Sequence, residues 1–300
     1  MSSNDLSFLK SIDGFLAIPE DEASSYEEAR AVIVPFGLEA SVSYGHGTAA
    51  GPAAIIKASH QVELFDEDLW CEPFRGFGVT TLAEPVIAKD IPSALAQLEG
   101  ICGRLLEDGK FPLVLGGEHS ITAGAIRPFA AKYPELTILH FDAHADLRDG
   151  YEGEPFSHAA AMRRCLDNPG VSIVSCGIRN ISAGEVPFLE ENPDRIKIFW
   201  AKDKHKWDLD EILSHLKGKT VYLSFDLDGF DASLMPATGT PEPGGLMWDD
   251  AIRIIEAASR VSRIVGADVN ELAPVKEMHY CDFLAAKLVY KILSYAFRKK

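Results

Sequence analysis

The sequence is poor in cysteine, and none of its five cysteines lies in a Cys-x-x-Cys pair. An odd number of widely spaced cysteines is typical of reduced thiols rather than of a disulfide framework. Basic residues are also scarce, because 29 Lys and Arg stand against 45 Asp and Glu, for a formal net charge of -16. This balance argues against nucleic acid or an anionic membrane as a partner. It fits a cationic ligand, and it fits equally an acidic surface that serves only solubility.

Two further absences concern location. The N-terminus has no basic segment followed by an apolar stretch, so it lacks the pattern of a signal peptide. No later run approaches the ~20 apolar residues of a membrane span. We therefore expect a soluble, cytoplasmic protein. Its 47% of hydrophobic residues suffice for a large core.

Short apolar runs rich in β-branched residues recur along the chain and predict buried strands. Segments with helical spacing lie between most of them. The alternation predicts an α/β fold, with a mainly parallel sheet and helices on both faces. No linker or repeat interrupts it, so we expect residues 1–300 to form a single domain. The predicted strands are 31–35, 111–115, 136–141, 171–176, 196–199, 221–225 and 264–269, and the predicted helices are 52–60, 91–109, 121–132, 208–218, 248–259 and 280–298.

Polar residues gather where three of these strands end, the edge at which open α/β sheets bind ligands. Gly-Gly-Glu-His ends at His119, Asp-Ala-His-Ala-Asp spans 142–146, and Asp-Leu-Asp spans 226–228. Side chains two positions apart point to the same side of extended backbone, so each of the last two groups can converge on one point. For the pair at 226 and 228, helix caps or turn residues are an equally good interpretation.

Several carboxylates buried together require cations to offset their charge. The set comprises four carboxylates and two imidazoles, and its charge of -4 would balance two divalent ions. Oxygen-rich ligation without thiolate favours Mn²⁺ over a structural zinc site, with Co²⁺, Ni²⁺ or Zn²⁺ as alternatives. Two such ions can activate a shared water, which predicts a hydrolase. The predicted ligands are His119, Asp142, His144, Asp146, Asp226 and Asp228.

Three motifs resemble the signatures of the ureohydrolase (arginase/agmatinase) family: GGEHS at 116–120, DAHAD at 142–146 and SFDLDGFDASLMPATGTPEPGG at 224–245. The resemblance extends from SYGHGTAAGPAAI at 43–55 to DVNELAP at 268–274. It implies the arginase fold, with a parallel eight-stranded sheet. It also implies one Mn²⁺ on His119, Asp142, Asp146 and Asp226 and a second on His144, Asp142, Asp226 and Asp228, so that two ions bind per chain.

The resemblance further implies a catalytic set of Asp146, Glu271 and His158. Glu271 would hold the substrate guanidinium, since a planar cation pairs bidentately with a carboxylate. His158 would relay a proton to the departing amine, a role suited to imidazole near neutral pH. The match at His158 is looser, because Ala159 replaces the glycine that often follows this histidine.

Substrate choice is expected to differ from that of arginases. Where the family holds the α-carboxylate and α-amine of arginine, this chain has Arg148, Glu154 and Ser182. A decarboxylated substrate is therefore favoured, and agmatine fits best, with Arg148 and Glu154 as further substrate contacts. Aminopropylagmatine, guanidinobutyrate, guanidine and arginine remain alternatives. The resemblance also implies a homo-oligomer, a trimer or hexamer, with a role in polyamine biosynthesis.

Two readings from other classes compete with a ureohydrolase. Deacetylases of acylated amines share the arginase fold but use one metal, and six ligand positions weigh against them. A non-catalytic guanidine-binding protein is the other. Three neighbouring polar residues are expected to be structural or peripheral. His140 should be a satisfied core histidine, Asp231 should brace the loop after Asp228, and His46 is either a pocket or a turn residue.

Overall fold

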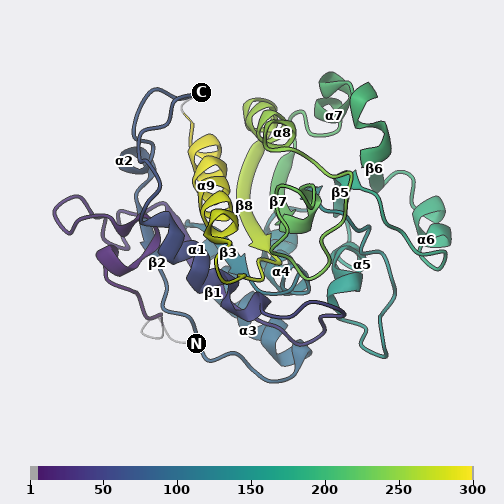
Figure 1. Cartoon of the computed structure of the whole chain (residues 1–300), viewed down its shortest axis with the longest axis horizontal. Helices are drawn as coiled ribbons and strands as arrows, with labels where there is room; N and C mark the ends of the chain where they lie inside the picture. Colours follow the sequence, from purple (N-terminus) through teal and green to yellow (C-terminus); the bar gives the residue numbers. More distant parts are fainter. Residues whose placement is uncertain (1–5, 299–300) are drawn as a thin grey trace.

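A computed structural model of the chain describes residues 6–298. Its eight strands form one all-parallel sheet in the order β2-β1-β3-β8-β7-β4-β5-β6 (Figure 1). The strands are β1 (Ala31–Phe36), β2 (Val79–Thr81), β3 (Phe111–Gly116), β4 (Leu136–Phe141), β5 (Ser172–Ile178), β6 (Ile196–Trp200), β7 (Thr220–Asp226) and β8 (Arg263–Asn270). Seven of them match predicted runs. The eighth, β2, is a three-residue edge strand and is too short to produce a recognisable pattern.

Helices cover both faces of the sheet, as the near-continuous apolar strands require. Along β1, Ala31 and Ile33 pack with α1, α8 and α9, whereas Val32 and Val34 pack on the opposite face with α3, α4 and α5. Figure 1 shows α9 beside β8, and α8 near the upper ends of β8 and β7. The helices are α1 (Gly51–Ser59), α2 (Phe74–Phe77), α3 (Ile91–Glu107), α4 (Ile121–Lys132), α5 (Ala161–Leu166), α6 (Val186–Glu191), α7 (Leu209–Ser214), α8 (Trp248–Val261) and α9 (His279–Ala296).

Capping residues in the sequence predict where α3 and α7 begin, but the ends of helices and the short helices are predicted less well. Asp90 caps α3 by accepting a hydrogen bond from the Ser93 N–H at 2.9 Å, and Asp208 caps α7 in the same way. The α7 helix ends at Ser214, before the predicted stop at residue 218. The short helices α2, α5 and α6 were not predicted, because they have only four to six residues and, unlike α7, no side-chain cap at their start.

The strand order brings the polar strand ends together. The strands β3, β8, β7 and β4 are consecutive neighbours, and in register Phe141 pairs with Phe225 while Asp226 pairs with Asn270. Four carboxyl ends therefore meet at one place on the sheet edge. None of the helices within residues 6–298 has the length and apolarity needed to cross a bilayer.

Gly116 and Gly117 let the loop after β3 pass close to its neighbours. A Cβ at Gly117 would lie 2.1 Å from the Leu38 carbonyl oxygen, and one at Gly116 would lie 2.0 Å from Asn270 Oδ1. Side chains at these positions would displace the loop that carries His119. The glycine pair is thus explained by packing, without a phosphate ligand.

Candidate metal centre and active site

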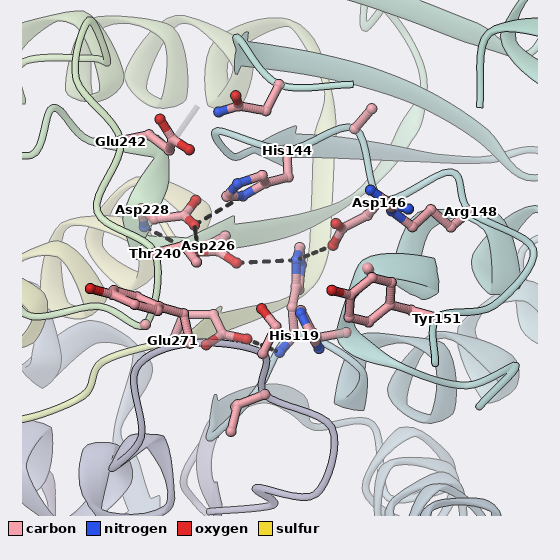
Figure 2. Close-up of a pocket in the computed structure, with 18 of the residues that line it drawn as sticks. His119, His144, Asp146, Arg148, Tyr151, Asp226, Asp228, Thr240, Glu242 and Glu271 are labelled. Atoms are coloured by element: carbon pink, nitrogen blue, oxygen red, sulfur yellow. Dashed lines mark hydrogen bonds and ion pairs between the residues drawn. The ribbon is translucent and has the colours of Figure 1, made fainter. Parts of the chain in front are cut away.

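A cavity of 340 Å³ opens at the carboxyl ends of the central strands. Figure 2 shows imidazole and carboxylate side chains converging in it from separate segments of the chain. Five of the six predicted ligands line it, and the sixth, Asp142, lies fully buried against two of them. Its lining includes His119, His144, Asp146, Arg148, Tyr151, His158, Asn180, Ser182, Glu185, Asp226, Asp228, Thr240, Glu242 and Glu271.

The predicted ligands fall into two groups that share Asp142. The first surrounds His119, whose Nδ1 lies 3.0 Å from Asp146 Oδ2, 3.1 Å from Asp142 Oδ2 and 3.4 Å from Asp226 Oδ2. The second surrounds His144, whose Nδ1 lies 3.1 Å from Asp228 Oδ2 and 3.6 Å from Asp142 Oδ1. Asp142 thus presents one oxygen to each histidine. This placement suits a carboxylate that bridges two cations.

The backbone around these ligands is less extended than the sequence analysis assumed. Asp146 has φ 52°, in the left-handed region, and Leu227–Gly229 forms a 3₁₀ turn. Asp226 caps that turn, accepting a hydrogen bond from the Asp228 N–H at 2.9 Å with Oδ1, while its Oδ2 faces His119. Asp226 is therefore both a cap residue and a candidate ligand. Side chains converge through turns rather than through strand alternation.

The environment of His119 provides a test of whether a cation fits. Ser224 Oγ donates its proton to Asp268 Oδ1 at 2.7 Å, so it must accept from His119 Nε2, 2.9 Å away. In a neutral ring, the proton on Nε2 leaves Nδ1 as a lone pair, and this buried atom has no hydrogen-bond partner among the described residues. It faces three carboxylates, which are also acceptors. A cation among these acceptors satisfies all four groups, so the residues fit a metal.

His140 forms a close group with His119 and Asp142 and is therefore an alternative ligand. Both of its ring nitrogens already have partners, because Nδ1 lies 3.0 Å from Ser175 Oγ and Nε2 lies 2.9 Å from Asp142 Oδ2. It is fully buried. These contacts confirm that His140 is a satisfied core histidine, and they make it a group that orients Asp142.

The electrostatics show how costly the cluster is without cations. Burial, and then repulsion from Asp228 and Asp142, raises the pKa of Asp226 well above its usual value. Burial alone would lower the pKa of His144, but Asp228 and Asp142 outweigh it and raise this pKa to about 12. Burial likewise opposes the charged form of His119, yet its carboxylate neighbours raise its pKa well above the usual value. Protons on these groups thus offset part of the cluster's negative charge where metal ions are absent.

Glu271 is the residue directly after β8, and its side chain lines the same cavity (Figure 2). Its Oε1 accepts a hydrogen bond from the His119 N–H at 2.6 Å, which ties it to the metal-site loop. Its backbone has φ 68°, a left-handed conformation that is uncommon for a non-glycine residue. Burial, and then the negative charge of Glu118, raises its pKa well above the usual value. A bound cation would favour its ionised form.

The structure brings His158 and Arg148 to the cavity but not Glu154. The His158 and Tyr151 rings form a T-shaped pair, with ring centroids 6.0 Å apart. The Arg148 guanidinium lies over Tyr151 at 5.1 Å, and its Nε is 3.9 Å from the Glu185 carboxylate. Glu154 is not among the residues that line the cavity. Its side chain accepts a hydrogen bond from the Phe156 N–H at 2.9 Å, so it stabilises a turn.

Asp231 and His46 both contact groups in the loops around them. Asp231 accepts hydrogen bonds from the N–H groups of Ser233, Gly244 and Gly245, which confirms that it braces the loop. The His46 side chain is 73% exposed and pairs with Glu39 at 3.3 Å, and it is not among the cavity residues. The turn interpretation of His46 is therefore the better one.

Arg179 has a structural role that the sequence analysis missed. Its guanidinium donates hydrogen bonds to five backbone carbonyl oxygens, three of them in the loop from Asp228 to Phe230. The Glu242 carbonyl is another acceptor, at 2.8 Å. Because a guanidinium carries a fixed fork of donors, it can hold several strands of loop at once. The only signal in the sequence was the position of Arg179 just after a predicted strand.

An all-parallel α/β sheet with paired imidazole and carboxylate groups at its carboxyl edge is the architecture of a metal-dependent hydrolase. The Arginase family model matches residues 29–294, and the chain belongs to this family. It is a metal-dependent ureohydrolase of the agmatinase-like class. Membership also favours a ureohydrolase over the deacetylase and non-catalytic readings.

Three similar proteins illustrate the relationship. A protein of Synechocystis named N(1)-aminopropylagmatine ureohydrolase is 37% identical over 92% of this chain and 92% of its own. An agmatinase of Bacillus anthracis is 35% identical over 84% of this chain and 86% of its own. The crystal structure of the agmatine ureohydrolase of Thermoplasma volcanium has a TM-score of 0.83 at 31% identity, and the match covers 96% of this chain and 95% of that one.

Proposed function

We propose that the protein hydrolyses agmatine to putrescine and urea with two Mn²⁺ ions per chain. The observation that carries the proposal is one cavity that holds both the paired His/Asp cluster and the buried carboxylate of Glu271. A guanidinium paired with that carboxylate would present its central carbon near the cluster. Similarity to named agmatinases supports the same substrate class.

The metal ions and the protein's side chains would have different roles in the reaction. When bound, two divalent ions would supply a water of lowered pKa and offset the ligand charge. One ion would be held by His119, Asp142, Asp146 and Asp226. The second ion would be held by His144 and Asp228 together with Asp142 and Asp226, which both sites share. Glu271 would orient the guanidinium, since a carboxylate fixes the plane of that cation by two parallel hydrogen bonds.

His158 would move the proton that the reaction requires. Water adds to the guanidinium carbon, the bond from this carbon to the alkylated nitrogen breaks, and the departing amine must gain a proton. An imidazole at the cavity wall can deliver it and be reprotonated from solvent. Putrescine and urea account for every atom of agmatine and water.

Charge in the cavity lining favours amine substrates over carboxylate substrates. Glu242 and Glu185 both line the cavity, and Figure 2 shows Glu242 among its lining side chains. No hydrogen bond or ion pair within residues 6–298 engages the Glu242 side chain. A terminal ammonium of the substrate would pair with it, whereas a carboxylate would be repelled. Among residues 6–298, Arg148 is the one lysine or arginine that lines the cavity, and the nearby Glu185 partly offsets its charge.

Aminopropylagmatine is the second candidate, because its extra amine would also suit the acidic cavity lining and a relative of Synechocystis carries that name. The test is urea release by Mn²⁺-loaded protein from agmatine, aminopropylagmatine, guanidinobutyrate, guanidine and arginine, with an acetylated polyamine as control. We expect agmatine to exceed arginine by at least ~10²-fold in kcat/KM, since an unpaired buried carboxylate is heavily penalised. Arginine turnover equal to that of agmatine would contradict the proposal.

We also propose that the protein acts as a homo-oligomer, a trimer or hexamer, without nucleic acid or membrane partners. The mass in solution by light scattering would test this.

A further inference from the structure

A buried carboxylate next to the metal site, Glu118, has no role in the mechanism described so far. It is fully buried, and four groups donate hydrogen bonds to it. The backbone N–H groups of Ala40 and Ser41 both reach Oε2 at 2.6 Å. The hydroxyls of Ser41 and Ser120 reach Oε1 at 2.8 Å and 2.6 Å. This saturation suits an ionised carboxylate, which accepts hydrogen bonds and donates none.

Ser41 links this carboxylate to His158. Its Oγ accepts a hydrogen bond from the His158 backbone N–H at 3.0 Å, and it lies 3.2 Å from Nδ1 of the same residue. A serine hydroxyl has one proton, and here that proton is directed to Glu118. The contact with the ring is therefore a hydrogen bond only if Nδ1 carries a proton and donates it. The reverse orientation would place two lone pairs against each other between Ser41 and Glu118.

We propose that Ser41 and Glu118 are positioning residues that hold His158 as its Nδ1–H tautomer. Nε2 is then the unprotonated nitrogen, and it remains available on a ring that lines the cavity. The T-shaped contact with Tyr151 also restrains this ring. A base that accepts and returns protons through one nitrogen works best when its other nitrogen is held by a fixed partner.

The inference rests on the proposed function, because it assigns a purpose to His158 in the proton relay. The tautomer that it assigns to His158 can nevertheless be tested separately from turnover. The tautomer of His158 is a property of the folded protein, and it can be measured without substrate.

The kinetic test compares Ser41→Ala with Ser120→Ala. Both substitutions remove a hydroxyl from the same Glu118 oxygen, but only Ser41 contacts His158. We expect Ser41→Ala to lower kcat for agmatine by roughly 10- to 10²-fold, within the range of general acid–base catalysis, with KM changed less than about twofold. Ser120→Ala should cost less than about threefold, and Ser41→Thr should recover most of the loss. Bound Mn²⁺ should stay equal in all variants.

A double substitution tests whether Ser41 acts through His158. In a His158→Ala background, Ser41→Ala should change kcat less than about twofold, because the group that it positions is gone. An equal loss in both backgrounds would overturn the inference. So would an equal loss in Ser41→Ala and Ser120→Ala.

The spectroscopic test reads the tautomer directly, with ¹⁵N-histidine-labelled protein loaded with diamagnetic Zn²⁺. In spectra recorded where the ring signals report the neutral form, His158 should show Nδ1 protonated and Nε2 unprotonated. Its signals are identified by their loss in His158→Ala. Ser41→Ala should shift them toward the other tautomer. Protonated Nε2 in the unsubstituted protein would overturn the inference alone, whereas absence of agmatine hydrolysis would refute the proposed function and leave the tautomer assignment intact.

Discussion

Replacing Arg179 should weaken metal binding from a distance, because this residue fixes the loop that carries Asp228. Arg179→Ala removes hydrogen bonds to five carbonyls at 2.7–3.3 Å, although Arg179 itself touches no predicted ligand side chain. A hydrogen bond from a charged donor contributes about 1.5–3 kcal/mol, and these five share one guanidinium and are not additive. We expect a loss of about 3 kcal/mol in the free energy of unfolding, or roughly 5–10 °C in Tm.

The same change should lower Mn²⁺ affinity by roughly 10- to 100-fold, the range seen when groups that orient metal ligands are removed. Arg195→Ala is a matched control, because the Arg195 guanidinium also ties backbone carbonyls together, those of Leu166, Asn168 and Val171. These carbonyls lie before β5, at the opposite end of the sheet from the cavity. Both variants should melt earlier than the unsubstituted protein. Only Arg179→Ala should need more Mn²⁺ in a titration followed by Tm.

A comparable affinity loss in both variants would show that general destabilisation, and not loop position, controls metal binding. Unchanged affinity in Arg179→Ala would show that Asp228 holds its place without the guanidinium. Either result would refute the reasoning.

Three further predictions concern the site itself. Asp142→Asn or Asp226→Asn should lose metal and nearly all activity. His158→Ala should keep its metal, as measured by elemental analysis, and lose roughly 10²- to 10⁴-fold in kcat. Retained metal in the aspartate variants would contradict the bridging roles. In metal-free protein, the stabilising contribution of His144, with its pKa of about 12, is complete below the unfolded value near 6.5 and declines as pH rises toward 12. Mn²⁺ must displace that proton, so the rise in Tm on adding Mn²⁺ should become larger from pH 6.5 to 9, and calorimetry should detect proton release. A rise in Tm that becomes smaller over this pH range would contradict the prediction. Arg148→Ala should raise KM for guanidinobutyrate more than KM for agmatine in parallel assays, and equal effects on both would show that Arg148 pairs with no substrate carboxylate.

The sequence predicted those features of the fold and site that depend on short-range patterns. Buried parallel strands are continuous apolar runs, and seven of them were visible for that reason. The cluster at 142–146 was visible because several costly groups lie within five residues. The three-residue β2 and the short helices carry too few residues to form a pattern. Glu154 was assigned to the pocket from loop alignment, and loop conformation instead turned its side chain to a local N–H.

Contacts between distant segments were beyond prediction for a different physical reason. Ser41 and His158 are 117 positions apart, and Ser224 and His119 are 105 positions apart. Single serines in a sequence of this composition carry no distinguishing mark. Their importance arises only when the strand order β3-β8-β7-β4 brings the loops together. Candidate ligands could therefore be proposed from the sequence, whereas the groups that would orient them could not.

The charge of the whole cavity explains why these orienting groups matter for substrate choice. Beyond the four ligand carboxylates, Glu271, Glu118 and Glu185 add three more buried acids, and the partly exposed Glu242 also lines the cavity. Two divalent ions would balance only the first four. Glu118 is stabilised by four donated hydrogen bonds and Glu185 by three, so neither needs a cation from the substrate.

Glu271 and Glu242 are different, because each retains a carboxylate oxygen that no described group satisfies by hydrogen bonding. Glu271 is buried and accepts a hydrogen bond from the His119 N–H, whereas Glu242 is partly exposed in the lining of the same cavity. A guanidinium joined to an ammonium by a flexible apolar chain supplies one cation to each position. A substrate with a carboxylate at its far end would leave Glu242 unpaired and add a second negative charge beside it. This distribution of satisfied and unsatisfied acids favours dicationic substrates such as agmatine over zwitterionic ones.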